Sequence, residues 1–266
     1  MPASAESDLH HVRPFVDETA NARALHFSIC EIQSRMRLCD PDALDLAYTR
    51  LMMGFLLFQP APRQLTMIGL GGGSLAKFCH RHLPRTHIRA VEINPHVIAL
   101  RDSFQVPKDG DRFTVVRGDG ADVVREAAMP CDVLLVDAYD SDGLPARLSN
   151  ARFYDDCQQA LEPGGVMVVN LHAGHARFDI LVDRVRRSFD GQVLVVHASD
   201  RSNSIVFAVK SRRLAAVRRG ALRRPPGLSA EAFAPLRADF AAVLVALAGH
   251  QEDERARPLA LSGRVA

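Results

Sequence analysis

Three carboxylates stand close together in the stretch LLVDAYDSDGLP, at Asp137, Asp140 and Asp142. Carboxylates this close repel one another and rise in pKa unless a cation lies among them. The pattern therefore favours a site that holds a cation or accepts its proton. A solvated acidic loop is the alternative interpretation of the same residues.

A second candidate site is the stretch TMIGLGGGSLAKF, in which Gly69, Gly71 and Gly73 precede a predicted helix that begins at Ser74. Residues without a Cβ let backbone N–H groups approach a ligand closely, and a helix start adds free donors and a positive dipole end. Glycines at such a turn also occur for tight packing alone, so the motif by itself is weak.

Two more strand ends carry polar residues suited to a nucleoside. Glu92, in AVEINP, follows the glycines by about 20 residues, where a carboxylate in such folds accepts hydrogen bonds from a ribose. Asp119 and Gly120, in RGDGAD, can offer a carboxylate and a backbone N–H to an adenine edge. A helix-capping carboxylate and an ordinary turn are the corresponding alternatives.

Seven short β-rich runs must position these residues: QLTMIGL, HIRAVEI, RFTVVRGD, CDVLLVDA, GVMVVNLH, GQVLVVHAS and SNSIVFAVK. Several are apolar throughout, as is typical of parallel strands with helices on both faces. Only DRSN joins the last two, which is too short for a crossover helix, so the last strand is predicted to be antiparallel. We therefore expect an α/β, Rossmann-like S-adenosylmethionine-dependent transferase fold with a seven-stranded, mostly parallel sheet. In such a sheet the ligand lies beyond the carboxyl ends of the strands.

Three regions are predicted along the chain. Residues 1–62 form a small N-terminal lead-in element with a reduced β region and a helix over DPDALDLAYTRLMMGFLLF. Residues 63–210 form the Rossmann-like domain. Residues 211–266 form a basic linker and a helical tail, with a helix near Ser229 to Ala248.

Composition excludes several classes of protein. The 266 residues are 47% hydrophobic, and 33 Lys and Arg nearly balance 31 Asp and Glu, so the net charge favours neither nucleic acid nor an anionic membrane. The five cysteines are scattered, without the spacing of a zinc site or a disulfide framework, which favours a reducing cytoplasm. We expect no signal peptide, and no apolar run approaches the length of a membrane span.

Together the motifs IGLGGGSLAKF, VEINPHVI, RGDGAD, VDAYDSDGLPARL and FYDDCQQALEPGGVMVVN resemble the spermidine synthase family of polyamine aminopropyltransferases. The resemblance runs from about Ile32 to Lys210. It implies a homodimeric enzyme that transfers an aminopropyl group from decarboxylated S-adenosylmethionine, without a metal, to putrescine or another polyamine. The by-product is 5'-methylthioadenosine.

The resemblance also implies roles for single residues. Glu92 corresponds to the ribose ligand, Asp119 and Gly120 to the adenine contacts, and Asp137 to the contact with the aminopropyl group. Asp140 corresponds to the base or orienting group for the attacking amine. Gln33, in EIQSRM, resembles a glutamine near the nucleoside, and Tyr48, in AYTRL, a tyrosine of the amine channel.

The chain departs from the family pattern at two places. Ser74 stands where the family has the aspartate that binds the donor's ammonium. Thr49 and Arg50 replace the histidine and glutamate of a Y-H-E sequence, which predicts a cation where a diamine would lie. Both changes put the acceptor in question, and Ser74 also fits the carboxylate of intact S-adenosylmethionine.

Three alternatives follow. One is a methyltransferase using S-adenosylmethionine, and the second is a non-catalytic protein that binds methylthioadenosine or polyamines. The third is nucleic-acid binding through a basic cluster of six arginines, Arg212, Arg213, Arg218, Arg219, Arg223 and Arg224, for which a solvated helix and linker is the default. His172 and His175 lack supporting metal ligands and are expected to have a loop role.

Overall fold

The computed structural model of the chain describes residues 11–28, 31–126, 130–140, 143–211, 214 and 222–256. Cys30, Asp142 and four of the six arginines of the basic cluster (Arg212, Arg213, Arg218 and Arg219) lie outside these residues, and the predictions that rest on them stay predictions.

A seven-stranded sheet forms the centre of the protein, in the order β6-β5-β4-β7-β8-β10-β9. Its strands are β4 (Gln64–Ile68), β5 (His87–Glu92), β6 (Phe113–Arg117), β7 (Cys131–Val136), β8 (Leu161–His172), β9 (Val193–His197) and β10 (Asn203–Val209). Strands β4 to β8 pair in parallel, whereas β10 is antiparallel to both β8 and β9. The predicted α/β fold is thus confirmed, and β10 is inserted between β8 and β9.

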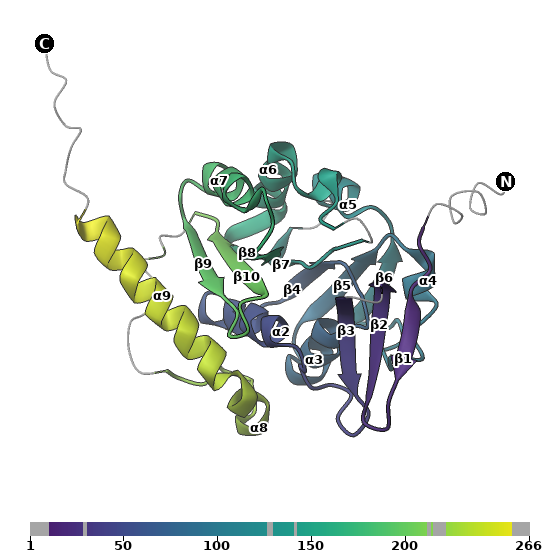
Figure 1. Ribbon diagram of the computed structural model, residues 1–266. Helices are drawn as coiled ribbons and strands as arrows, with labels where there is room; N and C mark the ends of the chain where they lie inside the picture. Colours follow the sequence, from purple (N-terminus) through teal and green to yellow (C-terminus); the bar gives the residue numbers. More distant parts are fainter. Residues whose placement is uncertain are drawn as a thin grey trace, which may run out of the picture.

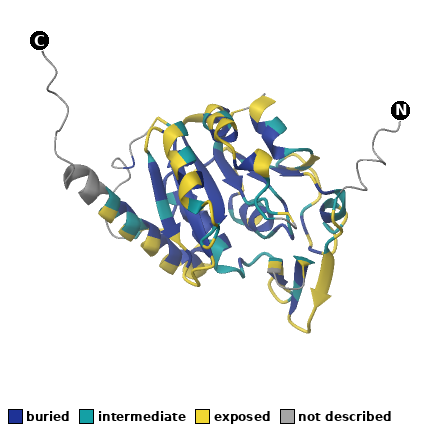
Figure 2. Cartoon of the chain, turned by 45° about the horizontal axis from the view of Figure 1, so that its top comes forward, coloured by how far each residue is buried: buried dark blue, intermediate teal, exposed yellow. Residues whose placement is uncertain are grey.

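Helices cover both faces of this sheet (Figure 1). They are α3 (Ser74–His82), α4 (Pro95–Ile98), α5 (Gly120–Glu126), α6 (Ala151–Ala160) and α7 (Phe178–Ser188). Helices α5, α6 and α7 pack on one face around an apolar cluster, and α2 (Ala47–Met52), α3 and α9 (Arg237–Ala256) border a second cluster on the other. Burial on both faces explains why the strands are apolar throughout, and Figure 2 shows the sheet as the most buried layer.

The N-terminal region holds a small antiparallel sheet of β1 (Phe15–Glu18), β2 (Ala22–Ser28) and β3 (Glu31–Arg37). It is followed by α2 (Ala47–Met52) and the 3₁₀ turn η1 (Met53–Leu57). The helical part is shorter than the predicted stretch, because the chain is extended at Leu46, directly before α2. The β region of this part of the chain consists of these three short strands.

The C-terminal tail is helical, with α8 (Ala230–Phe233), η4 (Ala234–Leu236) and α9 (Arg237–Ala256). By length and composition alone, Ala230–His250 could cross a membrane, with a mean hydropathy of 1.6. This corrects the expectation that no segment has that composition, and the reason is the many alanines between few charges. One such helix is weak evidence of a span, because Leu236, Phe240 and Val243 pack into the core.

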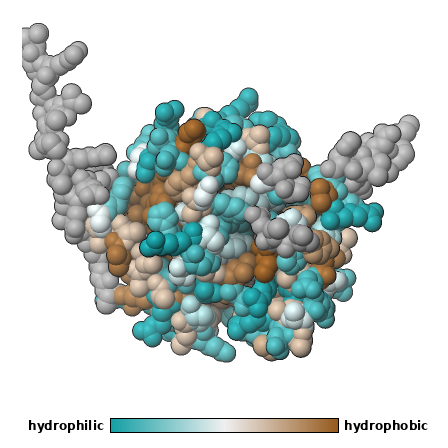
Figure 3. All heavy atoms as spheres, viewed as in Figure 1, coloured by the Kyte–Doolittle hydropathy of each residue, from teal (hydrophilic) through white to brown (hydrophobic). Residues whose placement is uncertain are grey.

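The surface in the same view as Figure 1 is mixed in hydropathy. Figure 3 shows apolar atoms in small groups between hydrophilic ones, and no single broad apolar patch lies on the face that it shows.

Candidate functional site

A cavity of about 450 Å³ lies at the carboxyl ends of the central strands. Ten of the eleven residues proposed from the sequence line it: Gln33, Tyr48, Gly69, Gly71, Ser74, Glu92, Asp119, Gly120, Asp137 and Asp140. Gly73 does not line it and is instead the residue before α3, with φ of 70°. The small β-sheet closes part of the cavity through Leu25 and Phe27.

The turn that contains Gly69, Gly71 and Gly73 lacks side chains for two reasons, close packing against neighbouring atoms and access for a ligand. Gly69 has φ of 95°, and a Cβ there would lie 2.1 Å from the carbonyl oxygen of Asp137. A Cβ on Gly73 would lie 2.5 Å from a methyl of Val106. Gly71 has φ of 53°, and among the described residues a Cβ there would come within 4 Å only of Ser34. Gly71 is therefore the position where the backbone is open to a ligand.

Glu92 organises this turn from the next strand. Its Oε2 accepts from the Leu70 N–H at 2.9 Å and its Oε1 from the Asn94 N–H at 2.8 Å. Burial raises the pKa of Glu92, and the backbone N–H groups that point at it oppose that rise. The carboxylate thus couples β5 to the glycine turn, whether or not it also contacts a ribose.

Asp119 has a cationic partner at the edge of the cavity. Arg147 Nη1 lies 2.5 Å from Asp119 Oδ2, and its Nη2 lies 2.7 Å from Asp122 Oδ1. The other oxygen of Asp119 accepts from the Ala121 N–H. A Cβ on Gly120 would lie 2.2 Å from Ile68, so that glycine is required by packing.

Asp137 lies at the end of β7 and is bound by two donors. Asn170 on β8 donates to its Oδ1 at 2.9 Å, and the Tyr48 hydroxyl on α2 also donates to it. Burial raises the pKa of Asp137, while these donors and His172 oppose the rise. Burial, with the nearby Asp137, also raises the pKa of Tyr48. A carboxyl of this kind takes a proton more readily than an exposed aspartate.

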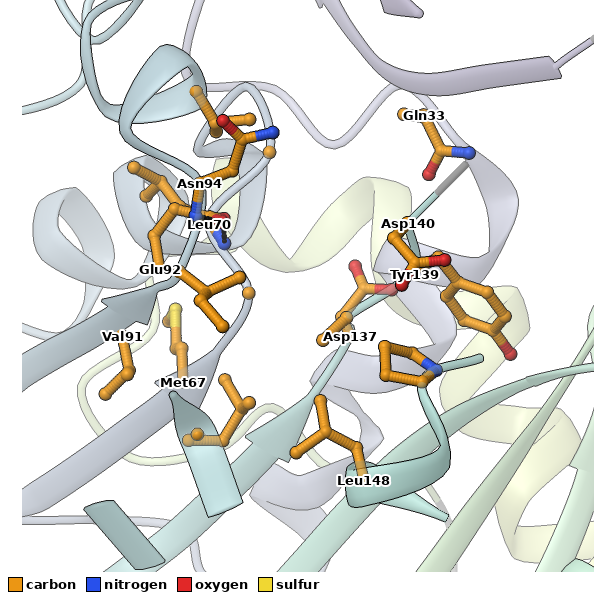
Figure 4. Close-up of a pocket in the computed structure, with 18 of the residues that line it drawn as sticks. Gln33, Met67, Leu70, Val91, Glu92, Asn94, Asp137, Tyr139, Asp140 and Leu148 are labelled. Atoms are coloured by element: carbon orange, nitrogen blue, oxygen red, sulfur yellow. Dashed lines mark hydrogen bonds between the residues drawn. The ribbon is translucent and has the colours of Figure 1, made fainter. Parts of the chain in front are cut away.

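Figure 4 shows Glu92 and Asp137 on opposite sides of the cavity, with Asp140 and Gln33 on the same side as Asp137. Asp140 is more exposed than Asp137 and exchanges backbone hydrogen bonds with Gly143. Tyr139, between the two carboxylates, stacks on His172 with ring centroids 4.2 Å apart. The predicted acidic mouth of the cavity is therefore formed by Asp137 and Asp140.

The two departures from the family pattern have different outcomes. Ser74 lines the cavity, and its Oγ lies 3.4 Å from that of Ser34. Arg50 does not line the cavity, because its Nε lies 3.5 Å from Asp239 on α9 and its Nη1 donates to Leu44 and Asp45 carbonyls. The expected cation at the diamine position is thus wrong. Thr49 is buried and donates to the Leu46 carbonyl.

Within the described part of the chain, no group of three or more His, Cys, Asp or Glu side chains is arranged to hold a metal ion. His172 stacks on Tyr139, and His175 accepts from the Arg177 N–H in the following loop.

Sequence reasoning missed Arg147, Asn170 and Asn203, which contact the predicted residues or each other. Asn170, in GVMVVNLH, is a polar residue within an otherwise apolar strand, and this was the available signal. Arg147, in the 3₁₀ turn η2 (Ala146–Leu148), carried no such signal, since an exposed arginine is ordinary.

Two comparisons of the sequence with known proteins give matches over most or half of the chain. The family model described as Spermine/spermidine synthase domain matches residues 45–178. The polyamine aminopropyltransferase of Chromobacterium violaceum is 41% identical over 196 residues, which are 73% of this chain and 75% of that protein.

Two solved structures share the fold at low identity. A probable spermidine synthase from Corynebacterium glutamicum has a TM-score of 0.63 and 17% identity, covering 74% of this chain and 76% of that one. Human methyltransferase-like protein 13, solved with SAH, has a TM-score of 0.57 and 23% identity, covering 75% and 93%. The fold alone therefore does not choose between donors.

Proposed function

The chain belongs to the spermine/spermidine synthase family, and on this premise we propose that it is a polyamine aminopropyltransferase. It transfers an aminopropyl group from decarboxylated S-adenosylmethionine to an amine acceptor and releases 5'-methylthioadenosine. The observation that carries the proposal is Asp137, a carboxylate with a raised pKa that faces a cavity bordered by the glycine turn.

The charges of the site suit this reaction. Both the sulfonium donor and the alkylammonium acceptor are cations, and Asp137 and Asp140 lie on the same side of the cavity. Two carboxylates near each other are stabilised when a cation lies between them. This supports a polyamine or diamine acceptor in a protein whose formal net charge is only +2.

We assign proton acceptance to Asp137 and orientation of the ammonium to Asp140. An alkylammonium has a pKa near 10, as a lysine does, and must lose a proton before it attacks. The raised pKa and interior position of Asp137 support this role, whereas the family resemblance assigns it to Asp140.

The reaction is then a displacement at carbon. The deprotonated acceptor nitrogen forms a bond to the aminopropyl carbon next to sulfur, and the carbon–sulfur bond breaks. The electron pair of that bond neutralises the sulfonium to give a thioether. No covalent bond forms between the protein and either substrate in this reaction. In-line placement of the two substrates therefore supplies much of the acceleration.

The nucleoside end of the donor fits the residues opposite Asp137. Gly71 leaves room beside the turn, Glu92 fixes that turn, and Asp119 with Gly120 supplies the edge proposed for adenine. Gln33 and Tyr48 border the amine side, Tyr48 through its bond to Asp137. Intact S-adenosylmethionine is less suited, because its carboxylate would add a negative charge beside Asp137 and Asp140.

The orientation of Arg50 supports an acceptor with more than one ammonium, since its guanidinium pairs with Asp239 outside the cavity. Putrescine and longer polyamines both remain candidates on this ground. We further propose a cytoplasmic homodimer. Of the five cysteines, Cys39, Cys79, Cys131 and Cys157 are free thiols in the described structure, which is compatible with a reducing compartment.

Incubation of the purified protein with either decarboxylated or intact S-adenosylmethionine and a panel of diamines and triamines tests the activity. Mass spectrometry should detect an aminopropylated amine and methylthioadenosine in equal amounts from the decarboxylated donor. Methylated products from the intact donor would favour the methyltransferase alternative. Tight methylthioadenosine binding without turnover would favour the non-catalytic one. Light scattering tests the dimer.

A further inference from the structure

Asn203 is not part of the cavity wall, yet a chain of side-chain amides connects it to Asp137. Its Nδ2 donates to Asn170 Oδ1 at 2.8 Å, and Asn170 Nδ2 donates to Asp137 Oδ1 at 2.9 Å. Asn170 is 3% exposed and Asn203 is 7% exposed. Buried amides of this kind keep the partners that the fold gives them, because water does not replace a lost bond.

The order of donors in this chain follows from Asp137. An ionised carboxylate accepts hydrogen bonds only, so Asn170 must present its NH₂ group to Asp137. Its carbonyl oxygen then faces Asn203, which must present an NH₂ group in turn. The remaining oxygen of Asn203 lies 2.7 Å from the Ser202 hydroxyl, whose single proton is shared between this oxygen and Asp200 Oδ1, also at 2.7 Å.

The backbone holds both asparagines in register. Asn203 begins β10 and stands opposite His172 on β8, the same strand that carries Asn170. The Tyr139 hydroxyl donates to the Asn170 carbonyl and accepts from the His172 N–H, both at 3.0 Å. Figure 1 shows β8 and β10 as neighbouring strands. The sheet therefore fixes the backbones of the two asparagines relative to each other.

We propose that Asn203 is a positioning residue for the reaction, which acts by fixing the amide of Asn170 so that a donor always faces Asp137. The inference rests on the proposed function of Asp137. It extends the catalytic arrangement to the β9–β10 hairpin, which has no contact with the substrates in the proposed site.

Asn203→Asp tests the orientation directly. A carboxylate at position 203 is an acceptor and turns the Asn170 amide, so that the oxygen of Asn170 faces Asp137. Ionisation of Asp137 is then disfavoured. We expect at least a tenfold loss of kcat near pH 7, an acidic limb of the pH profile shifted to higher pH, and unchanged affinity for methylthioadenosine. Asn203→Leu removes the donor that fixes Asn170 without imposing the reverse orientation, so its loss of kcat should be measurable but smaller than that of Asn203→Asp.

A double variant separates orientation from simple charge repulsion. In an Asn170→Leu background there is no amide to turn, so Asn203→Asp should cause no further loss of turnover. An equal loss in both backgrounds would contradict the proposal. So would equal effects of Asn203→Asp and Asn203→Leu in the native background, since a purely structural role predicts that result.

A readout that needs no turnover separates this inference from the proposed function. The carboxyl ¹³C resonance of Asp137 reports the titration of that group. The resonance is assigned by its loss in Asp137→Asn. The other titratable groups near Asp137 are Tyr48, Tyr139, Asp140 and His172. The titration should move to higher pH in Asn203→Asp and move in the same direction by a smaller amount in Asn203→Leu. If the resonance shifts as predicted but the protein turns over no donor, the positioning role of Asn203 is supported and the proposed function fails. An unmoved resonance in Asn203→Asp overturns the positioning.

Discussion

Arg50 on α2 pairs with Asp239 on α9, with 3.5 Å between Arg50 Nε and Asp239 Oδ2. Both side chains are largely covered, at 25% and 11% exposure. The pair links the helix that carries Tyr48 to the C-terminal helix. An arginine that the sequence pattern assigned to the acceptor site thus forms an ion pair between the domain and the C-terminal helix.

Arg50→Met should lower the free energy of unfolding by about 1 to 3 kcal/mol, because it leaves Asp239 covered and without its cation. Chemical denaturation measures the change. Arg152→Met is the matched control. Arg152 is 77% exposed and lies 4.0 Å from Asp156, which makes a long and weak ion pair, so this substitution should have almost no effect. We expect both variants to keep the native affinity for methylthioadenosine. A large loss of that affinity in Arg50→Met would show that Arg50 belongs to the site.

Gly69→Ala should destabilise the fold and remove nucleoside binding. The added Cβ would meet the Asp137 carbonyl in a backbone conformation that alanine rarely adopts, so the ends of β4 and β7 must separate. We expect a loss of at least about 2 kcal/mol by denaturation. Gly110→Ala, which meets nothing within 4 Å, should leave both properties near the native values. Native-like binding in Gly69→Ala would show that the turn tolerates a side chain.

Arg147→Met should tighten methylthioadenosine binding. The guanidinium occupies an oxygen of Asp119 that the adenine amino group is proposed to use, so the ligand must displace or share it. The ion pair is exposed, and a gain of about two- to fivefold is expected by calorimetric titration. Asp119→Asn provides the complementary control and should weaken binding. A weaker affinity in Arg147→Met would instead make Arg147 a ligand contact.

Lys77 on α3 gives the fold a pH dependence of its own. Burial lowers the pKa of Lys77 to about 8, against the weaker opposing effect of Asp42, and its Nζ donates to the Phe104 carbonyl at 2.8 Å. Above pH 8 the unfolded chain keeps a proton that the folded chain has lost, so stability rises with pH up to the unfolded pKa near 10.4. Relative to Lys77→Met, the native protein should gain about 2.5 kcal/mol between pH 7 and pH 10. A parallel dependence in both proteins would mean that another group is responsible.

Much of this arrangement follows from local sequence. Residues at the carboxyl ends of parallel strands meet at one edge of the sheet, and for this reason the strand pattern alone assigns Glu92, Asp119 and Asp137 to one cavity. The antiparallel last strand follows from the short connection between the last two strands, which in the structure is the five residues 198–202.

Other features depend on contacts between distant parts of the chain. Local pattern does not encode that β10 enters between β8 and β9, and this insertion brings Asn203 to Asn170. The direction of Arg50 is set by Asp239, far away in sequence. The sequence therefore indicates that these residues are polar or charged, but contacts with distant parts of the chain decide where their side chains point.

The most direct test compares Asp137→Asn and Asp140→Asn with the native protein in the same two measurements. Methylthioadenosine affinity is determined by calorimetry, and the rate of aminopropyl transfer from decarboxylated S-adenosylmethionine is determined with the best amine of the panel. We predict that both variants bind the nucleoside with near-native affinity, that Asp137→Asn loses turnover by at least about 100-fold, and that Asp140→Asn retains a measurable rate with a raised KM for the amine. Undiminished turnover in Asp137→Asn would contradict the central claim that this carboxylate takes the proton of the acceptor.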